Sequence, residues 1–372
     1  MINPEELAKH YTKFRVTERI LLTGHSHQAW PDVAFDAQQQ AWLDTAEHVD
    51  DVWELAFEKA NEVRRGFARL LDDTPERIAL AENTHELVVR FLSALPLRKR
   101  PQLVTTDGEF HTIRRQLDRL AEEGIKVIKV PAMPATTLAE RLAITVDDRT
   151  AAVLVSAVLF ANAHIVPNLR AVQEACDRVG AELLVDAYHA LNVVPFSLVE
   201  QQLERAYVVG GGYKYCQLGP GNAFLRFPQD SDLRPVVTGW FSEFTALSRA
   251  PTGGRVVYDP GPARWAGATY DFTSHYRAAA VFRFFEAQKL TPQKLRELSQ
   301  HQIDTLSGAT RNDTVGGFLA IPAPRAGRIQ QALRKQDIWT DYRGDMLRVG
   351  PAPYVTDAQL ERAAKAIRSA LR

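Results

Sequence analysis

The chain has few cysteines, no excess of charge of either sign and no long apolar run. Only Cys176 and Cys216 are cysteines among 372 residues, and neither stands in a CxxC or similar spacing. A disulfide framework or a metal site is therefore not expected. Lysine plus arginine and aspartate plus glutamate number 45 each, so no basic surface for nucleic acid is predicted.

No stretch approaches the roughly 18 consecutive apolar residues of a membrane span. The N-terminal residues 1–7 are polar and charged and lack the apolar core of a signal peptide. We therefore predict a cytoplasmic protein without a membrane or nucleic-acid partner.

Apolar runs that alternate with helical patterns predict the fold class. Buried strands separated by helices are typical of a parallel sheet covered on both faces, so we predict an α/β fold. The expected strands are 78–80, 102–105, 127–130, 151–156, 183–185 and 206–209, and the expected helices between them are 84–95, 112–123 and 168–179. Residues 221–227 indicate an additional edge or hairpin strand.

The chain is longer than one ordinary hydrophobic core, so more than one domain is expected. Residues 228–272 are rich in Pro, Gly, Trp and Tyr without periodicity, which predicts long functional loops. The alternation of expected helices and strands after that segment indicates a small α+β domain. We predict an N-terminal arm packing with the small domain (1–45), a large domain (46–275) and a small C-terminal domain (276–372).

An acid and a lysine each follow a predicted strand. Asp186 comes directly after an apolar run, and Lys214 follows the strand 206–209 and three glycines. Ligands bind at the carboxyl ends of parallel strands, so both side chains are expected at one edge of the sheet. There a lysine can form a Schiff base with pyridoxal 5'-phosphate (PLP), and an acid can hold the ring nitrogen protonated. The glycines 210–212 would let the backbone approach the cofactor. The alternatives are a surface lysine and a turn or cap aspartate.

Other segments offer further contacts to such a cofactor. Asn83 or Thr84 caps a helix whose N-terminal N–H groups suit a phosphate, although an ordinary N-cap looks the same. His189 could reach the cofactor or orient the acid, and the alternative is a satisfied core histidine. Phe110 could stack on the ring, and Ser156 ends an apolar strand.

Arg348 lies within the expected strand 346–349. An inward-facing guanidinium there needs an anion, and a substrate carboxylate suits its bidentate fork. An interdomain salt bridge is the alternative. Among the histidines, His27 and His111 flank the proposed cofactor turns and could line a substrate pocket.

Taken together, these residues resemble the PLP-dependent enzymes of fold type I, within them the class V aminotransferase superfamily, and most closely kynureninase. Residues 186–189 read Asp-Ala-Tyr-His where kynureninases have Asp-Leu-Ala-His, and residues 212–219 resemble their Ser-Tyr-Lys-Tyr-Leu-Asn-Ala-Gly motif. The resemblance extends from roughly residue 20 to the C-terminus. It implies a mostly parallel sheet sandwiched by helices, a small α+β C-terminal domain, and a homodimer whose subunits both contribute to each active site.

The resemblance also implies residue roles. Lys214 would be the Schiff-base lysine, Asp186 the partner of the pyridinium nitrogen, and Arg348 the ligand of the substrate α-carboxylate. Further cofactor contacts would come from Thr84, Phe110, His189, Tyr213, Trp240 and Thr269, the last standing where an Asn is usual.

The substrate side departs from the kynureninase pattern. Kynureninases carry a His-x-x-Gly-x-x-Pro-Trp stretch near the substrate ring, whereas residues 48–53 keep only His48 of its first part and lack the Gly and Pro. The Asn-Ser-Leu-Gly turn near the N-terminus reads His-Ser-His-Gln at residues 25–28. The cofactor machinery therefore carries over better than the substrate pocket.

We predict a PLP-dependent enzyme whose small-molecule substrate is an amino acid, with kynureninase-like hydrolysis of a Cβ–Cγ bond that releases alanine. The alternative is a class V aminotransferase or another β-specific lyase, because these share every cofactor residue named. A cysteine desulfurase is disfavoured because no cysteine follows Cys216, which we interpret as structural. A cofactor-binding sensor without activity is disfavoured because no DNA-binding module is present.

Overall fold

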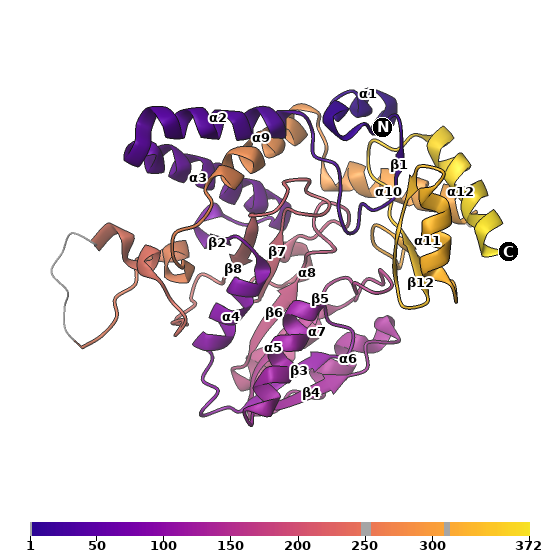
Figure 1. Cartoon of the computed structure of the whole chain (residues 1–372). Coiled ribbons are helices and arrows are strands. Elements are labelled where there is room, and N and C mark those ends of the chain that lie inside the picture. Colours follow the sequence, from indigo (N-terminus) through magenta and orange to yellow (C-terminus); the bar gives the residue numbers. More distant parts are fainter. Residues whose placement is uncertain (1, 247–253, 309–312) are drawn as a thin grey trace.

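A seven-stranded sheet forms the centre of the molecule (Figure 1). The computed structural model describes residues 2–246, 254–308 and 313–372. The strand order is β2-β8-β7-β6-β5-β3-β4. The strands are β2 (Ile78–Ala81), β3 (Gln102–Thr106), β4 (Lys126–Val130), β5 (Thr150–Ser156), β6 (Glu182–Asp186), β7 (Tyr207–Gly211) and β8 (Ala223–Arg226).

The predicted parallel sheet is confirmed for β4, β3, β5, β6 and β7, which pair in parallel. The predicted additional strand, β8, forms an antiparallel hairpin with β7 and also pairs antiparallel with β2. It therefore lies inside the sheet rather than at its edge. All four residues of β8 are buried, which suits a strand with a neighbour on each side.

Helices cover both faces of this sheet, and the strand side chains alternate between them. On β5, Val153 and Val155 pack in the cluster that contains residues of α7, whereas Leu154 packs with residues of α4 and α5. Burial on both faces explains why these strands are apolar without alternation. The helices up to this point are α1 (Pro4–Ala8), α2 (Val33–His48), α3 (Val52–Leu71), α4 (Thr84–Ala94), α5 (His111–Glu122), α6 (Leu138–Ala143), α7 (Leu169–Val179) and α8 (Leu198–Gln201), followed by α9 (Thr273–Ala287).

The C-terminal part forms a separate α+β layer beside the large sheet (Figure 1). Its antiparallel sheet has the order β11-β12-β9, and β11 was not among the predicted strands. Its elements are α10 (Pro292–Ser307), β9 (Leu319–Pro322), α11 (Ala326–Arg334), β10 (Ile338–Trp339), β11 (Asp341–Arg343), β12 (Met346–Val349) and α12 (Asp357–Leu371).

The N-terminal segment joins both parts of the molecule. Its strand β1 (Ile20–Leu21) pairs in parallel with β10 of the C-terminal layer. Helix α2 instead packs against α9, which also packs against α3 (Figure 1). The domain boundaries after residues 45 and 275 stay predictions.

Residues 228–272 contain 3-10 turns at Trp240–Ala246 and Gly261–Trp265 and no strand in their described part. Their middle, 247–253, lies outside the described residues. Among the helices of the described ranges, none has the length and apolar character needed to cross a membrane.

Candidate active site

A cavity of about 350 Å³ opens at the carboxyl ends of the parallel strands, facing the C-terminal layer. Ser156 and Asp186 are the last residues of β5 and β6 and are register partners across the two strands. The cavity brings together nine predicted site residues: Asn83, Thr84, Phe110, Ser156, Asp186, His189, Tyr213, Lys214 and Arg348.

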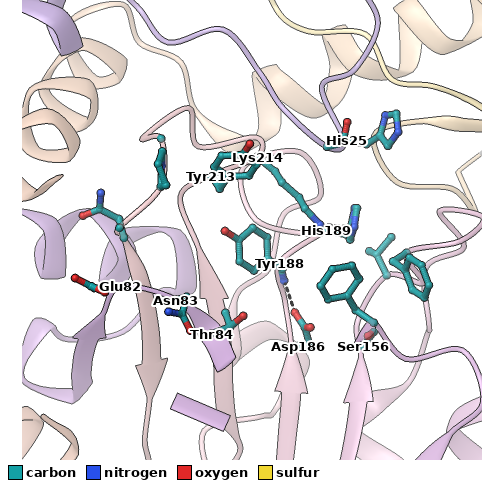
Figure 2. A pocket seen from close by; sticks show the side chains of 18 of the residues that line it. His25, Glu82, Asn83, Thr84, Ser156, Asp186, Tyr188, His189, Tyr213 and Lys214 are labelled. Atoms are coloured by element: carbon teal, nitrogen blue, oxygen red, sulfur yellow. Dashed lines mark hydrogen bonds between the residues drawn. The ribbon is translucent and has the colours of Figure 1, made fainter. Parts of the chain in front are cut away.

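Lys214 reaches into the middle of this cavity (Figure 2). Its Nζ lies 2.7 Å from Nε2 of His189. The same atom lies 5.3 Å from the ring centre of Phe110 and 4.8 Å from that of Tyr188. Burial lowers the pKa of Lys214 to about 8, against an opposing effect of Asp186. More of the amine is therefore uncharged near neutral pH than in an ordinary lysine, which favours nucleophilic attack.

Burial also shapes the acid and the histidine. The Asp186 Oδ1 accepts a hydrogen bond of 2.9 Å from the backbone N–H of Tyr188 (Figure 2). Burial raises the pKa of Asp186, although that hydrogen bond and Lys214 counteract it. No ion pair compensates this carboxylate within the described ranges, so a cationic ring nitrogen would fit it. Burial lowers the pKa of His189 well below its usual value, so the imidazole is neutral.

The opposite end of the cavity suits a phosphate. Asn83 is the N-cap of α4, and its side chain accepts a 3.0 Å hydrogen bond from the N–H of Glu86. Thr84 begins the helix, so its N–H is among those that a helix leaves without an internal partner. Tyr213 enters the same space from beyond β7, and its hydroxyl lies 2.8 Å from Nδ1 of His27. The lysine, the acid and this helix end together fit PLP.

Neighbouring side chains fill the space beside the glycines that precede Lys214. A Cβ on Gly211 would come within 2.9 Å of the Tyr188 ring, and one on Gly212 would meet Leu218 at 2.4 Å. A Cβ on Gly210 would likewise clash with Leu191. These glycines thus leave room for neighbouring side chains, of which only the tyrosine faces the cavity.

The C-terminal layer provides the other wall. Arg348 lines the cavity, yet its Nε and Nη2 bind both oxygens of Asp341 at 2.9 and 2.5 Å, and its Nη1 donates to the carbonyl of Phe160. Asp341 is the register partner of Arg348 in the β11–β12 hairpin. His25 Nε2 lies 2.8 Å from Oδ1 of the same aspartate. Arg348 therefore both faces the cavity, as predicted, and forms an ion pair, although the pair lies within one layer.

Five residues proposed from the sequence, among them His111 at the exposed start of α5, do not line the cavity of their own chain. His27 stands next to it, in contact with Tyr213. His48 is exposed at the end of α2, and Trp240 and Thr269 are exposed on the segment 228–272. Because each of these three lies on the surface, a role for it requires a contribution to the cavity of another subunit. The role stays a prediction.

The structure adds residues that the sequence did not single out. Tyr188 lies between Asp186 and Lys214 (Figure 2), and its place inside the Asp-Ala-Tyr-His segment was the available signal. Arg343 lines the cavity from β11. The contact of His25 with Asp341 joins residues 316 positions apart, so no local pattern could reveal it.

Known proteins with related sequences cover most of the chain. Residues 286–367 match the family model of the kynureninase C-terminal domain. An uncharacterized aminotransferase of Bacillus subtilis, YcbU, is 22% identical over 336 residues, which are 87% of each chain. The isopenicillin N epimerase of Streptomyces clavuligerus is 24% identical over 338 residues, 82% of this chain and 83% of that protein.

Solved structures share the fold. The cystine C-S lyase C-DES superposes with a TM-score of 0.82 at 17% identity, covering 95% of this chain and 98% of that one. A cysteine desulfurase of Thermococcus onnurineus gives a TM-score of 0.80 at 16% identity, covering 100% of this chain and 98% of that one.

The fold is that of the PLP-dependent enzymes of fold type I, and the residues that line the cavity fit this cofactor. Within that class, the chain is similar to the class V aminotransferases along most of its length and to kynureninase in residues 286–367.

Proposed function

We propose that this enzyme binds PLP through Lys214 and catalyses a kynureninase-like hydrolysis, in which the Cβ–Cγ bond of an amino acid breaks and alanine is released. The observation that carries the proposal is the group of Lys214, His189 and Asp186 at the strand ends, facing a C-terminal layer that matches the kynureninase domain. When bound, PLP supplies an electron sink for a carbanion at Cα.

The residues around the cavity have separate tasks in this proposal. Lys214 holds the cofactor and, once its amine is free, moves a proton at Cα. Neutral His189 fixes the position of that amine at 2.7 Å. Asp186 compensates a protonated ring nitrogen, and Arg348 orients the α-carboxylate of the substrate. The rings of Phe110 and Tyr188 exclude water from the amine.

A class V aminotransferase is the second candidate. The specific observation in its favour is the relative from Bacillus subtilis, which is described as an aminotransferase and matches most of the chain. Both reactions use Lys214 to remove the proton at Cα. They differ afterwards, because hydrolysis needs water at the γ-carbonyl whereas transamination returns a proton to the cofactor.

Cysteine desulfurization is a poor candidate despite the related folds. That chemistry needs a reactive thiol, and the chain has only Cys176 and Cys216. Both are buried, and burial raises the pKa of each thiol to about 12. Neither cysteine lines the cavity, so neither can serve as a thiolate nucleophile there.

One experiment separates these candidates. The purified protein is loaded with PLP, its visible absorbance is recorded, and kynurenine or 3-hydroxykynurenine is added while alanine is measured. Release of alanine supports the hydrolase. A yellow protein that releases no alanine from either compound contradicts it, and an amino-group transfer assay with keto acids then tests the aminotransferase. A protein that takes up no PLP contradicts both.

We further propose a homodimer with shared active sites. Large apolar side chains remain exposed on the single chain. Trp42 on α2 is 78% exposed, and Val236 and Trp240 in the segment 228–272 are 80% and 43% exposed. Exposed apolar area of this kind favours association. Sedimentation velocity of the PLP-loaded protein should give the mass of two chains, and a monomer with full activity contradicts shared sites.

A further inference from the structure

A second buried acid lies beside the proposed cofactor site. Glu109 is 1% exposed and directly precedes Phe110. Its Oε2 accepts a hydrogen bond of 2.6 Å from the hydroxyl of Ser156. Its Oε1 accepts bonds from the hydroxyl of Thr106 at 2.7 Å and from the backbone N–H of Ser156 at 3.2 Å. Within the described ranges, no Lys, Arg or His hydrogen-bonds to this carboxyl group.

Ser156 connects Glu109 to the cavity. It lines the cavity at the end of β5, and its register partner on β6 is Asp186. The two acids therefore stand on either side of one serine. Both carboxyl groups are removed from water, so a negative charge on one disfavours the ionised form of the other. Burial and the charge of Asp186 raise the pKa of Glu109 to about 7, although the bonds from Ser156 and Thr106 oppose the shift. The residues that hydrogen-bond to Glu109, Thr106 on β3 and Ser156 on β5, are uncharged.

A proton on Glu109 would reverse the direction of one of its hydrogen bonds. The ionised carboxylate accepts all three bonds. A protonated carboxyl must donate once, and the backbone N–H of Ser156 cannot accept. Thr106 Oγ1 already accepts from the N–H of Gly108 at 3.1 Å, so it is best placed to keep donating. The bond that reverses is therefore the one between Oε2 and the Ser156 hydroxyl, which frees the serine hydrogen to point into the cavity.

We propose that Glu109 is a positioning residue that sets, through Ser156, whether a hydrogen-bond donor or only an acceptor faces the cofactor ring beside Asp186. This inference rests on the proposed binding of PLP. With Glu109 ionised, Ser156 presents lone pairs to the cavity. With Glu109 protonated, Ser156 presents a hydrogen to the cavity beside Asp186.

Three variants test this role. Glu109→Gln keeps the shape and cannot titrate, Glu109→Asp keeps an acid, and Ser156→Ala removes the connecting hydroxyl. The first readout is the visible absorbance of the PLP-loaded protein as a function of pH. We expect the wild type and Glu109→Asp to show a transition near neutral pH that Glu109→Gln and Ser156→Ala both lose. An unchanged transition in Glu109→Gln overturns the inference.

The second readout needs no cofactor. The pKa of Glu109 is raised from 4.5 to about 7, so the folded apoprotein retains a proton that the unfolded chain has lost in this window. Stability contributed by that proton is present at low pH and is lost as the pH rises through about 7. The difference between the thermal unfolding midpoints of Glu109→Gln and the wild type should therefore grow from pH 4.5 to 7. Ser156→Ala should keep the wild-type trend, because Glu109 still titrates.

The two readouts separate the possible failures. A protein that takes up no PLP overturns the proposed function and the role of Glu109 with it. Normal uptake of PLP with parallel unfolding curves of Glu109→Gln and wild type overturns only the inference, because Glu109 then retains no proton near neutral pH.

Discussion

The two walls of the cavity are built in different ways. The wall on the large sheet consists of residues at the ends of successive strands, with Ser156 on β5, Asp186 on β6 and Lys214 after β7. The opposite wall includes His25 and Arg348, and Asp341 behind them binds both side chains. The residues of the first wall can be found from local sequence patterns. The second wall depends on the contact between His25 and Asp341, which are 316 positions apart.

The two walls also differ in charge. On the sheet side, Lys214 and Asp186 are buried without a direct ion pair between them, and burial shifts both pKa values toward the neutral form. On the other side, Arg348 and Asp341 compensate each other. Burial alone would raise the pKa of Asp341, but hydrogen bonds from His25 and Arg348 hold it well below its usual range. In the proposed function the reacting groups therefore lie on the sheet wall, and the group that binds the substrate carboxylate lies on the other wall.

The largest effect should follow from Lys214→Ala, which breaks the reactive wall. Activity should fall by roughly 10²–10⁴-fold, the contribution of a proton-transfer group of this kind. The visible absorbance that depends on the lysine should disappear. Absorbance spectra and initial rates measure both effects, and Lys335→Ala, a change of an exposed lysine, serves as the control. Unchanged visible absorbance in Lys214→Ala would refute the assignment.

Arg348→Ala should affect the binding wall. Loss of a charged hydrogen bond to the substrate is worth about 1.5–3 kcal/mol, so KM for the α-amino acid should rise roughly 10- to 100-fold with little loss of bound PLP.

The ion pair with Asp341 supplies the control for this prediction, because Arg348→Ala removes the closest cation of that aspartate and leaves only Arg343 at 3.8 Å. The double variant Arg348→Ala with Asp341→Asn removes the stranded charge as well. If it restores KM, Arg348 acts only as a structural partner. Equal losses of PLP retention and substrate affinity in the single variant point to the same conclusion.

A smaller effect concerns His25 in the same wall. Burial lowers the pKa of His25 from 6.5 to about 4, although the hydrogen bond with Asp341 counteracts part of the shift. Between these values the unfolded chain binds a proton that the folded state does not, so stability is present above pH 6.5 and lost as the pH falls toward 4. His25→Gln keeps an N–H donor but cannot titrate. Between pH 6.5 and 4 the variant should therefore lose about 1–3 kcal/mol less of its free energy of unfolding than the wild type loses.

Chemical denaturation at several pH values measures this difference. Burial lowers the pKa of His275 in both proteins, whereas the charge of His25 contributes to the lowered pKa of His189, so the difference reports His25 together with its effect on His189. Identical pH dependence in the two proteins would show that His25 is not held neutral by burial.

This contrast explains how much could be predicted from the sequence. The parallel strands were found because burial on both faces leaves continuous apolar runs, and the strand ends then located Asp186 and Lys214. The sequence also indicated Arg348, but not its partner, because β11 spans only Asp341–Arg343 and lacks an apolar run. For glycines 210–212 the sequence predicts a close approach of the backbone to the cofactor, whereas nothing local reveals that Tyr188 and Leu218 also need the space a Cβ would fill.

The smallest effect is expected from Cys216→Ala, which tests whether the cysteine next to the reactive wall takes part in the reaction. Cys216 stands two residues after Lys214, but it is buried away from the cavity and packs in the main hydrophobic cluster. Removing a small buried group should cost about 1 kcal/mol of stability and change kcat/KM less than about twofold, or 0.4 kcal/mol. Cys176→Ala, on α7, is the matched control. A large loss of activity in Cys216→Ala alone, with normal PLP absorbance, would mean that a thiol acts in the reaction, and the difference between the two walls would then have to include this residue.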